Sequence, residues 1–477
     1  IPPLPMPKRG DFGWTLPQGD EPLSFQDLSR LLPQVGINWV KLPVWYGANT
    51  PHRGDELIRF VELIGASNIE VVGIVDKPPA DSELGARTGS DMPIAELFSL
   101  DPSLWSQALE PVMTRLSLRV RWWQLGRDYD CSVSGSPELN QRVTELRNGL
   151  FRFGQDVRLG MCFDGANASQ GMGQVTWDFQ QNCGEIPQTA KAFNELLAKK
   201  MDNSARRWIL VEPPALANDP AQANEASLAA RSSEFVRRLV AAKENGVDGI
   251  IVPKPFNDEN GLMRANGMWR TTAAMLGGAK YLGQMQLPGN SENRVFVRPD
   301  HQVVMVVWNR ELTKEVLYFG DNVRIVDMTG RTVPAQQESN EQSIAVGPAP
   351  IFVIGLHEAI TRWRMAVDME FLHVASELSK AHANSIRFHN FFSQGVGGTV
   401  RIVVPQNDHR DEQLESEERA AEPATFMPDR WTIEPPQAAF QLAAGEEGKV
   451  PFEIRLKNAL YGKQPVRLDF TIDADEH

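Results

Sequence analysis

The sequence lacks the features that define membrane and nucleic-acid-binding proteins. No apolar run approaches the roughly 20 residues that a membrane-spanning helix needs, so we expect no membrane insertion. Positive charge is in deficit, because the formal net charge is −13 at pH 7. Nucleic acids are bound by basic patches that face their phosphates. We therefore expect no nucleic-acid partner.

Short motifs for several kinds of chemistry are also missing. The sequence contains no GxxxxGKS or GxxxxGKT loop, no GxGxxG after a strand, no HExxH and no CxxC. Only His52, of eight histidines, lies in the first 290 residues. A Ser–His–Asp or Cys–His nucleophile would depend on that histidine, and a zinc site would need it together with scattered carboxylates. We expect neither a metal nor a cofactor.

Cysteine is scarce, and three residues cannot build a disulfide framework. Cys162 lies inside an apolar run and is predicted to be a small buried hydrophobe. Cys131 and Cys183 each follow a predicted strand, and a bond between them is left open. The chain starts at Ile1 without a visible signal peptide. The cellular location is undetermined, with a secreted or periplasmic one favoured over the cytoplasm, and the oligomeric state is unknown.

Apolar runs that alternate with helix-like segments fill the first 290 residues. Runs of this length predict parallel strands buried on both faces, and the segments between them have helical spacing, the last at 270–285. Eight strand–helix units predict a (β/α)8 TIM barrel. The expected strands are 11–17, 39–47, 69–77, 121–130, 157–165, 174–179, 207–214 and 249–256.

The pattern changes after Pro288, where short strands with turn residues replace the strand–helix alternation. We expect a barrel of catalytic type over 1–290, a small antiparallel β domain over 291–363 and an immunoglobulin-like β-sandwich over 364–477. The fold class is therefore α/β, a TIM barrel followed by two β domains. Whether the chain is a fragment of a longer protein is left open.

Polar residues stand at the ends of the predicted barrel strands, where the active sites of such barrels form. Nine of the twelve tryptophans lie in the first 270 residues, and flat aromatic faces beside acids suit sugars. We expect most of these tryptophans in the core and a few at the rim. The sequence therefore predicts a carbohydrate substrate, with the following substrate-binding residues: Trp14, Trp45, Lys77, Arg127, Asp164, Asp178 and Lys254.

Two carboxylates fit the hydrolysis of a glycosidic bond. A retaining glycosidase uses one carboxylic acid to protonate the leaving oxygen and one carboxylate as nucleophile, about 5–5.5 Å apart. Asp128 ends the fourth predicted strand and Glu212 ends the seventh. We expect Glu212 to be the nucleophile and Asp128 the acid/base of a retaining glycosidase that acts on a polysaccharide or glycoconjugate.

These stretches resemble the clan A glycoside hydrolases, and the chain looks nearest to family 39-like members. The segment Trp122–Asp128 is similar to the clan's Trp-x-x-x-Asn-Glu, whose Glu is the acid/base, and Ile209–Pro213 is similar to the strand end that carries the nucleophile. Residues 256–262 resemble the clan's Asp-x-x-Gly-Leu turn. The small β domain expected over 291–363 is similar to the accessory β domain of such enzymes. Residues 365–477 look like an immunoglobulin-like module associated with alpha-galactosidases.

One departure from the clan pattern affects the expected chemistry. Arg127-Asp128 stands where the clan has Asn-Glu. Arginine donates hydrogen bonds but accepts none, aspartate is one methylene shorter, and a neighbouring arginine favours the ionised carboxylate. The site is either rebuilt, for example for an anionic substrate bound by Arg127 and Lys254, or belongs to a catalytically inactive carbohydrate-binding or scaffold barrel. A third hypothesis is a lyase or aldolase with Lys254 as a Schiff-base amine.

Overall fold

The computed structural model forms two compact units. The first comprises Ile1–Tyr318 with Asn322–Gly355, and the second comprises Phe319–Asp321 with Leu356–His477. The division into three domains at 290 and 363 stays a prediction. The residues described are 6–16, 22–47, 50–89, 92–133, 147–148, 156–163, 177–182, 187, 189–198, 205–214, 225–256, 265–320, 322–333, 335–338, 341–375, 377, 380–403, 431–456 and 466–473.

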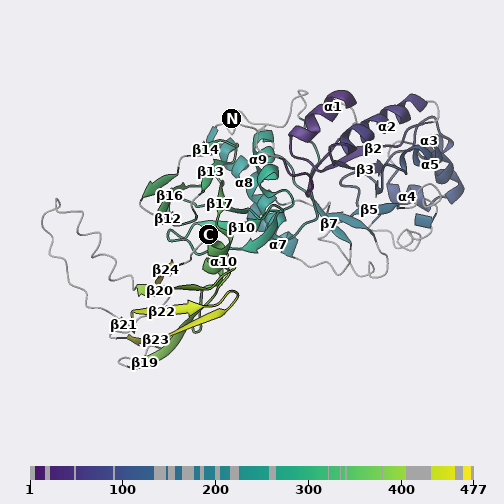
Figure 1. Cartoon of the computed structure of the whole chain (residues 1–477). Coiled ribbons are helices and arrows are strands. Elements are labelled where there is room, and N and C mark those ends of the chain that lie inside the picture. Colours follow the sequence, from purple (N-terminus) through teal and green to yellow (C-terminus); the bar gives the residue numbers. More distant parts are fainter. Residues whose placement is uncertain are drawn as a thin grey trace. The chain divides into compact units, whose positions relative to one another are not determined.

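A closed barrel of eight parallel strands forms the core of the first unit (Figure 1). Each strand pairs with its neighbours in chain order, and β8 closes the ring on β1. This confirms the predicted fold class. The strands are β1 Phe12–Thr15, β2 Trp39–Pro43, β3 Glu70–Val75, β4 Trp122–Leu125, β5 Arg158–Phe163, β6 Phe179–Asn182, β7 Arg206–Leu210 and β8 Gly249–Val252.

Helices with one apolar stripe accompany the strands. In α2, Leu57, Phe60, Val61 and Ile64 recur at helical spacing and are buried, as expected for a helix packed on a core. Within the described residues, no helix is long and apolar enough to cross a membrane. The helices are α1 Phe25–Leu31, η1 Leu32–Gln34, α2 Pro51–Gly65, α3 Glu83–Thr88, α4 Ile94–Ser99, α5 Pro102–Leu116, α7 Ala190–Ala198, α8 Glu225–Glu244 and α9 Asn266–Leu276.

The final barrel helix is shorter than the predicted 270–285. Helix α9 ends at Leu276, and Gly278 adopts a positive φ of 69°, a conformation that glycine tolerates and that ends helices. Strand β9 follows at Lys280–Gly283 and pairs with β10 of the next sheet. The Gly277-Gly278 pair ends the helix, although the helical spacing of apolar residues continues beyond it.

Aromatic side chains fill the amino-terminal end of the barrel interior. The ring centroids of Trp39 and Trp208 are 5.0 Å apart, and those of Phe179 and Trp208 are 4.5 Å apart. Trp122 completes this aromatic plug, with the guanidinium groups of Arg158 and Arg206 at 4.7 and 4.8 Å from its ring, within cation–π range. Large rings fit here because neighbouring strands contribute glycines: Gly13, Gly160 and Gly249.

Gly160→Ala is expected to destabilise the barrel by about 1–3 kcal/mol, the usual cost of overpacking a filled core. A Cβ at this position would lie 2.2 Å from ring atoms of Phe179, which neighbouring rings hold in place. Urea denaturation measures the loss. Gly65→Ala in α2 is the matched control, because its Cβ would meet nothing within 4 Å and alanine favours a helix. Equal effects of the two changes would contradict the tight packing.

Antiparallel sheets complete the first unit. One has six strands in the order β14-β13-β17-β11-β10-β9, and the other has three in the order β12-β16-β15. Beyond β9, the strands are β10 Glu292–Val297, β11 Val303–Trp308, β12 Thr313–Leu317, β13 Arg324–Asp327, β14 Thr332–Val333, β15 Gln336–Glu338, β16 Glu341–Val346 and β17 Ile351–Leu356.

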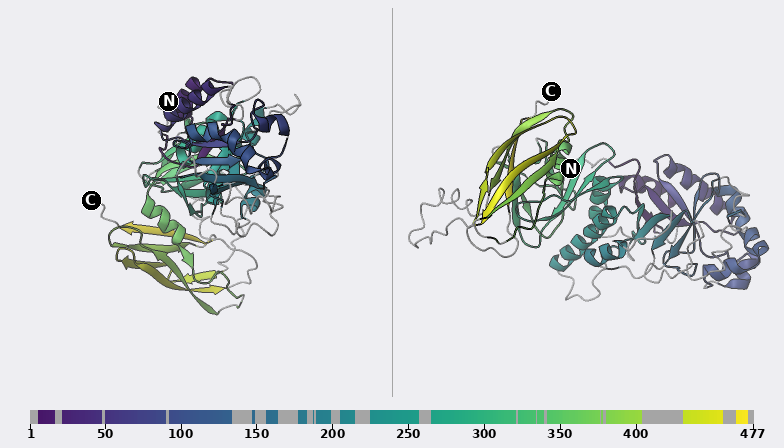
Figure 2. Two further views of the ribbon diagram at one scale, coloured as in Figure 1. Left: turned by 90° about the vertical axis from the view of Figure 1, so that its right-hand side faces the viewer. Right: turned by 90° about the horizontal axis from the view of Figure 1, so that it is seen from below.

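The second unit pairs a helix with two antiparallel sheets, of order β18-β19-β23-β21 and β22-β20-β24. Its strands are green to yellow in Figure 2. Trp363 of the helix lies 5.2, 5.7 and 5.8 Å from the rings of Phe388, Phe440 and Phe470 and anchors the core. The elements are α10 Glu358–Ala366, β18 Asp368–Met369, β19 Ala381–His389, β20 Val396–Val403, β21 Trp431–Glu434, β22 Gln437–Leu442, β23 Glu447–Leu456 and β24 Arg467–Asp473.

Candidate functional site

A layer of polar side chains lies inside the barrel on the rim side of the aromatic plug. Each member stands two residues beyond a residue of the plug layer on the same strand, and therefore points to the same face. Three of them, Lys41, Gln124 and Gln181, have no exposed surface. Buried polar groups need partners, and the loop after β4 (residues 126–133, the β4 loop) supplies one.

Asp128 of the β4 loop points into this layer and is enclosed by donors. Thr15 Oγ1 donates to Asp128 Oδ2 at 2.6 Å, and Lys41 Nζ forms a short hydrogen bond to Oδ1. Gln181 Nε2 donates to Oδ1 at 2.8 Å and Gln124 Nε2 at 3.3 Å. The Asp128 side chain is 7% exposed and that of Lys41 is 0% exposed. Asp128 therefore completes a buried ion pair.

The charge state of Asp128 follows from these partners. Burial acts to raise the pKa of this carboxyl, but the Lys41 charge and the hydrogen bonds from Gln181, Lys41 and Thr15 outweigh it. The pKa of Asp128 therefore lies below its ordinary value, and the carboxylate is ionised at neutral pH. An ionised and fully bonded carboxylate has no proton to give. This geometry favours a structural role and speaks against the general-acid role expected from the sequence.

Glu212 follows β7 at the rim and differs from Asp128 in its surroundings. Tyr129, the next residue of the β4 loop, donates its hydroxyl hydrogen to Glu212 Oε1 at 2.6 Å. Arg238 Nη2 donates to the Glu212 carbonyl at 2.9 Å. Glu212 is half-buried, and its Oε2 accepts no hydrogen bond from any described residue. One carboxylate oxygen is thus held, and the other has no hydrogen-bond partner among the described residues.

Tyr129 is a site residue that sequence reasoning missed. Its backbone has a φ of 75°, which is a left-handed conformation. This conformation is energetically unfavourable for a residue with a large side chain, and it occurs at functional sites. Burial, the hydrogen bond to Glu212 and the charge of Glu212 raise the pKa of the phenol above its ordinary value. The hydroxyl therefore stays protonated and donates to the carboxylate.

Arg127 pairs with the end of β3. Its Nε lies 3.1 Å from Asp76 Oδ2, and the Arg127 side chain is 56% exposed. Asp76 Oδ1 also accepts from the backbone N–H of Lys77 at 2.7 Å. Burial raises the pKa of Asp76 above its ordinary value despite the opposing charge of Arg127. The structure therefore brings Lys77 and Arg127 to one side of the rim, together with Asp76.

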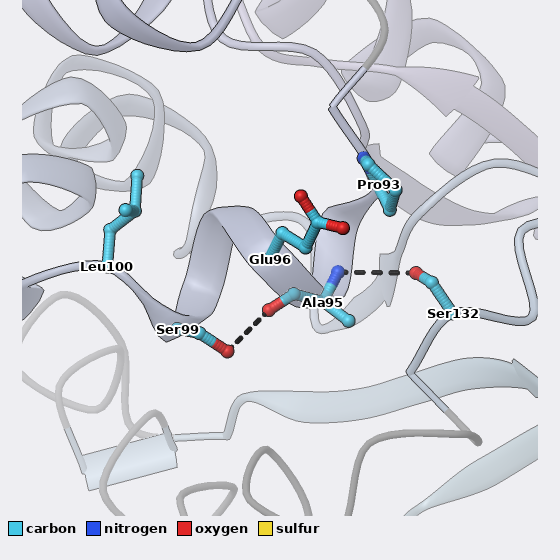
Figure 3. A pocket seen from close by; sticks show the side chains of 6 residues that line it. All are labelled: Pro93, Ala95, Glu96, Ser99, Leu100 and Ser132. Atoms are coloured by element: carbon cyan, nitrogen blue, oxygen red, sulfur yellow. Dashed lines mark hydrogen bonds between the residues drawn. The ribbon is translucent and has the colours of Figure 1, made fainter.

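The β4 loop is also fixed to α4. Asp130 Oδ2 accepts from the backbone N–H of Ile94 at 3.4 Å, and Ser132 Oγ accepts from that of Ala95 at 3.2 Å. Figure 3 shows the contact between Ala95 and Ser132. These two residues, with Glu96 and Leu100, are among those that line a hollow of about 480 Å³. The β4 loop thus contacts side chains of β1, β2 and β6, side chains that follow β3 and β7, and backbone N–H groups of α4.

Two tryptophans expected at the rim lie behind the barrel wall. Thr15 points inside the barrel, so its neighbour Trp14 points to the helices, where it is fully buried 6.3 Å from the ring of Trp269. Trp45 Nε1 donates to the carbonyl of Ala108 in α5 at 2.9 Å. Both therefore pack between strands and helices and not at the rim, where the sequence predicted them.

Asp178 lies at the other end of the barrel. The predicted strand 174–179 would end in it, but β6 begins at Phe179, so Asp178 precedes the strand at the amino-terminal face. There its Oδ2 accepts from Arg147 Nη2 at 2.9 Å and from the Leu159 N–H at 2.8 Å. Asp178 therefore stands at the opposite end of the barrel from the rim, where the sequence predicted it to bind substrate. Asp164 lies outside the described residues.

Lys254 follows β8 on the rim and is exposed. It forms no ion pair with a residue in the described ranges, so the expected contact with a ligand stays a prediction. A Schiff-base lysine is activated by burial or by a neighbouring cation. The exposure of Lys254 gives the lyase or aldolase hypothesis no support.

The cysteines fall into two environments. Cys162 is a free, buried thiol within the polar layer, where Gln181 Nε2 donates to its sulfur at 3.3 Å. Burial raises the pKa of this thiol to about 12, so it is unreactive at neutral pH. Cys131 is disulfide-bonded, which ties down the β4 loop further, and Cys183 lies outside the described residues. In the described part of the chain, no group of three His, Cys, Asp or Glu residues is placed to hold a metal ion.

Solved structures that are similar to this chain include glycoside hydrolases. The chain is similar to a family 39 glycoside hydrolase from the gut symbiont Bacteroides cellulosilyticus WH2, with a TM-score of 0.54 and 12% identity over 73% of this chain and 81% of that one. It is also similar to the catalytic domain of the GH30 xylanase C from Talaromyces cellulolyticus, with a TM-score of 0.50 and 11% identity over 74% and 99% of the two chains. No protein-family model and no curated protein matches the sequence. At these identities the likeness establishes the fold.

Proposed function

We propose that this chain binds carbohydrate at the rim of its barrel and hydrolyses glycosidic bonds there with Glu212 as nucleophile. The carrying observation is the state of Glu212: one carboxylate oxygen is held by Tyr129 at 2.6 Å and the other accepts no hydrogen bond from the described residues. The position at the end of β7 and the resemblance to clan A glycosidases support the same role. The substrate class is a polysaccharide or glycoconjugate.

The reaction is a double displacement at the anomeric carbon. Glu212 Oε2 attacks that carbon, an ester bond forms, and the bond to the leaving oxygen breaks with its electron pair on that oxygen. Water then attacks the anomeric carbon, loses a proton and releases the Glu212 carboxylate. Tyr129 orients the carboxylate for the first step through its hydroxyl. The leaving oxygen takes its proton from solvent water, and the water that attacks in the second step returns one to solvent, so the protons balance without Asp128, which is ionised.

Hydrolysis is therefore expected to depend steeply on the leaving group. General acid catalysis contributes about 10²–10⁴-fold, and an activated leaving group departs without it. We expect 2,4-dinitrophenyl glycosides to turn over at least about 10²-fold faster than phenyl glycosides of the same sugar. A panel of both substrates for glucose, xylose, galactose, mannose and fucose measures this difference.

The Asp128→Asn variant provides the control for that experiment. If Asp128 is structural, the substitution changes the turnover of both substrates by the same factor. The contrary result has two parts: the wild-type protein shows little leaving-group dependence, and Asp128→Asn slows only the phenyl glycosides. That result would make Asp128 the acid/base and contradict its assignment as a buried ion-pair partner.

The buried Asp128–Lys41 pair specifically favours a second candidate, a barrel that binds carbohydrate without cleaving it. In that case the wild-type protein hydrolyses none of the activated glycosides. Saturation-transfer NMR with the same sugars then detects binding, and Glu212→Gln leaves that binding in place. Turnover of any activated glycoside that depends on Glu212 excludes this candidate.

A further inference from the structure

A hollow in the second unit is lined by aromatic, charged and hydroxyl side chains that all belong to that unit. It has a volume of about 480 Å³, and the residues around it include His357, Glu358, Arg362, Phe391, Phe392 and Ser393. These come from the start of α10 and from the loop that joins β19 to β20. Small-molecule sites typically occupy roughly 300–1,000 Å³, so the hollow has the size for a small ligand.

The aromatic part of the lining is held out to solvent by a rigid loop. Phe392 packs into the core, 9% exposed, whereas the adjacent Phe391 is 36% exposed. The fully buried Asn390 fixes this loop: its Nδ2 donates to the carbonyls of Gln394 at 2.9 Å and Ala443 at 2.8 Å, and its Oδ1 accepts from the Phe392 N–H at 2.9 Å. The exposure of Phe391 is therefore built into the loop.

The Phe391 ring is further positioned by a neighbour. The ring centroid of His389, the last residue of β19, lies 4.4 Å from that of Phe391 at an angle of 58°. A ring supported in this way offers a flat apolar face at a fixed position. The C–H face of a pyranose is the complementary surface for such a ring.

The polar part of the lining presents donors and acceptors without net charge. Arg362 Nε donates to Glu358 Oε1 at 2.8 Å, and both side chains are partly exposed. The guanidinium has further N–H donors and the carboxylate has further lone pairs, and together they match neighbouring hydroxyls of a sugar. Because the two charges cancel, the lining suits a neutral polyhydroxyl ligand better than an ionic one.

We propose that this hollow is a carbohydrate-binding site for neutral sugars, with Phe391 as the stacking platform and Glu358 and Arg362 as the hydroxyl partners. The site goes beyond the proposed hydrolysis, because it holds a polysaccharide through the second unit whether or not the barrel cleaves it. The two sites share only the chemical class of their ligand.

Affinity electrophoresis of the full chain tests this site. Native gels that contain xylan, glucomannan, galactomannan or barley β-glucan serve as probes, and the Glu212→Gln background prevents cleavage of the polymer. At least one gel should retard the protein, and Phe391→Ala and Arg362→Ala should each weaken that interaction at least fivefold. Leu372→Ala, another change of an exposed apolar side chain in the same unit, 76% exposed, should migrate like its parent.

The outcomes separate the two proposals. Retardation that is equal in the Phe391→Ala, Arg362→Ala and Leu372→Ala variants would overturn the second site and assign the binding to another surface. The absence of retardation in all four gels would also overturn it. Neither result bears on Glu212, because aryl glycoside turnover is measured separately and the Phe391→Ala variant in the wild-type background should hydrolyse small substrates at the parental rate.

Discussion

Lys41→Met is expected to lower the free energy of unfolding by about 3–5 kcal/mol, the cost of removing one partner from a buried ion pair. Methionine keeps the length of the side chain but leaves the Asp128 carboxylate inside the barrel without its counter-charge. Lys41 has no exposed surface and Asp128 has little, so water cannot replace the lost partner at either group. Urea denaturation at pH 7 measures the change.

The stability of the wild-type protein and that of Lys41→Met should respond differently to a fall in pH. In the wild-type protein the pKa of Asp128 lies below its unfolded value, so its stabilisation is present above about pH 4 and is lost as the pH falls through the folded pKa. In Lys41→Met, burial acts without an opposing charge and raises the folded pKa. The variant therefore regains stability as the pH falls toward 4, whereas the wild-type protein regains none.

A double variant isolates the stranded charge. Asp128→Asn removes the charge while its amide can still accept from Thr15, so Lys41→Met/Asp128→Asn should be more stable than Lys41→Met alone. Strict additivity of the two single substitutions would show that the residues do not interact, and would contradict the ion pair as the source of the loss.

Glu212→Gln is expected to lower the hydrolysis of 2,4-dinitrophenyl glycosides by about 10⁴-fold or more, the scale seen when a catalytic nucleophile is removed. An amide cannot form the covalent ester with the anomeric carbon. The hydroxyl of Tyr129 can still donate to the amide oxygen, so the fold should tolerate the change. Initial rates and a melting curve on the same preparation separate lost chemistry from lost structure.

Glu70→Gln provides the matched control for Glu212. It makes the same chemical change at the first residue of β3, at the opposite end of the barrel, where the side chain is exposed. Its activity should equal that of the wild-type protein. Adding azide to Glu212→Ala should restore turnover by forming a glycosyl azide. If Glu212→Gln retained more than about a tenth of the activity, the nucleophile would lie elsewhere.

The sequence predicts the barrel well because its signals are local. Strands buried on both faces give long apolar runs, and helices buried on one face give helical spacing of apolar residues. Seven of the eight expected strands overlap the observed ones by four or more residues. The sixth is the exception: the run 174–179 contains only the first residue of β6, Phe179. Polar Gln180, Gln181 and Asn182 form the rest of that strand, and Gln181 has its polar partners Lys41 and Asp128 in the barrel interior.

The candidate site was harder to predict because its contacts join distant parts of the chain. Lys41 stands in the apolar run WVKLP and Gln181 in FQQN, 140 residues apart, yet their side chains are in contact. The available signal was a lysine within an apolar run at an inward position. Tyr129 gave no signal at all, since its left-handed backbone and its bond to Glu212 exist only once β4 and β7 are in place.

The aromatic plug fills the amino-terminal end of the barrel interior, so the polar layer lies between the plug and the rim. Among the described residues, Arg127, Tyr129 and Glu212 stand on the rim side of the Lys41–Asp128 pair, and the aromatic plug stands on its other side. A sugar ring bound to those rim residues would cover the polar layer beneath it and reduce its access to solvent. Occupancy of the rim and hydration of the barrel interior are thereby linked, so a ligand that closes the mouth also strengthens the electrostatic interactions under it.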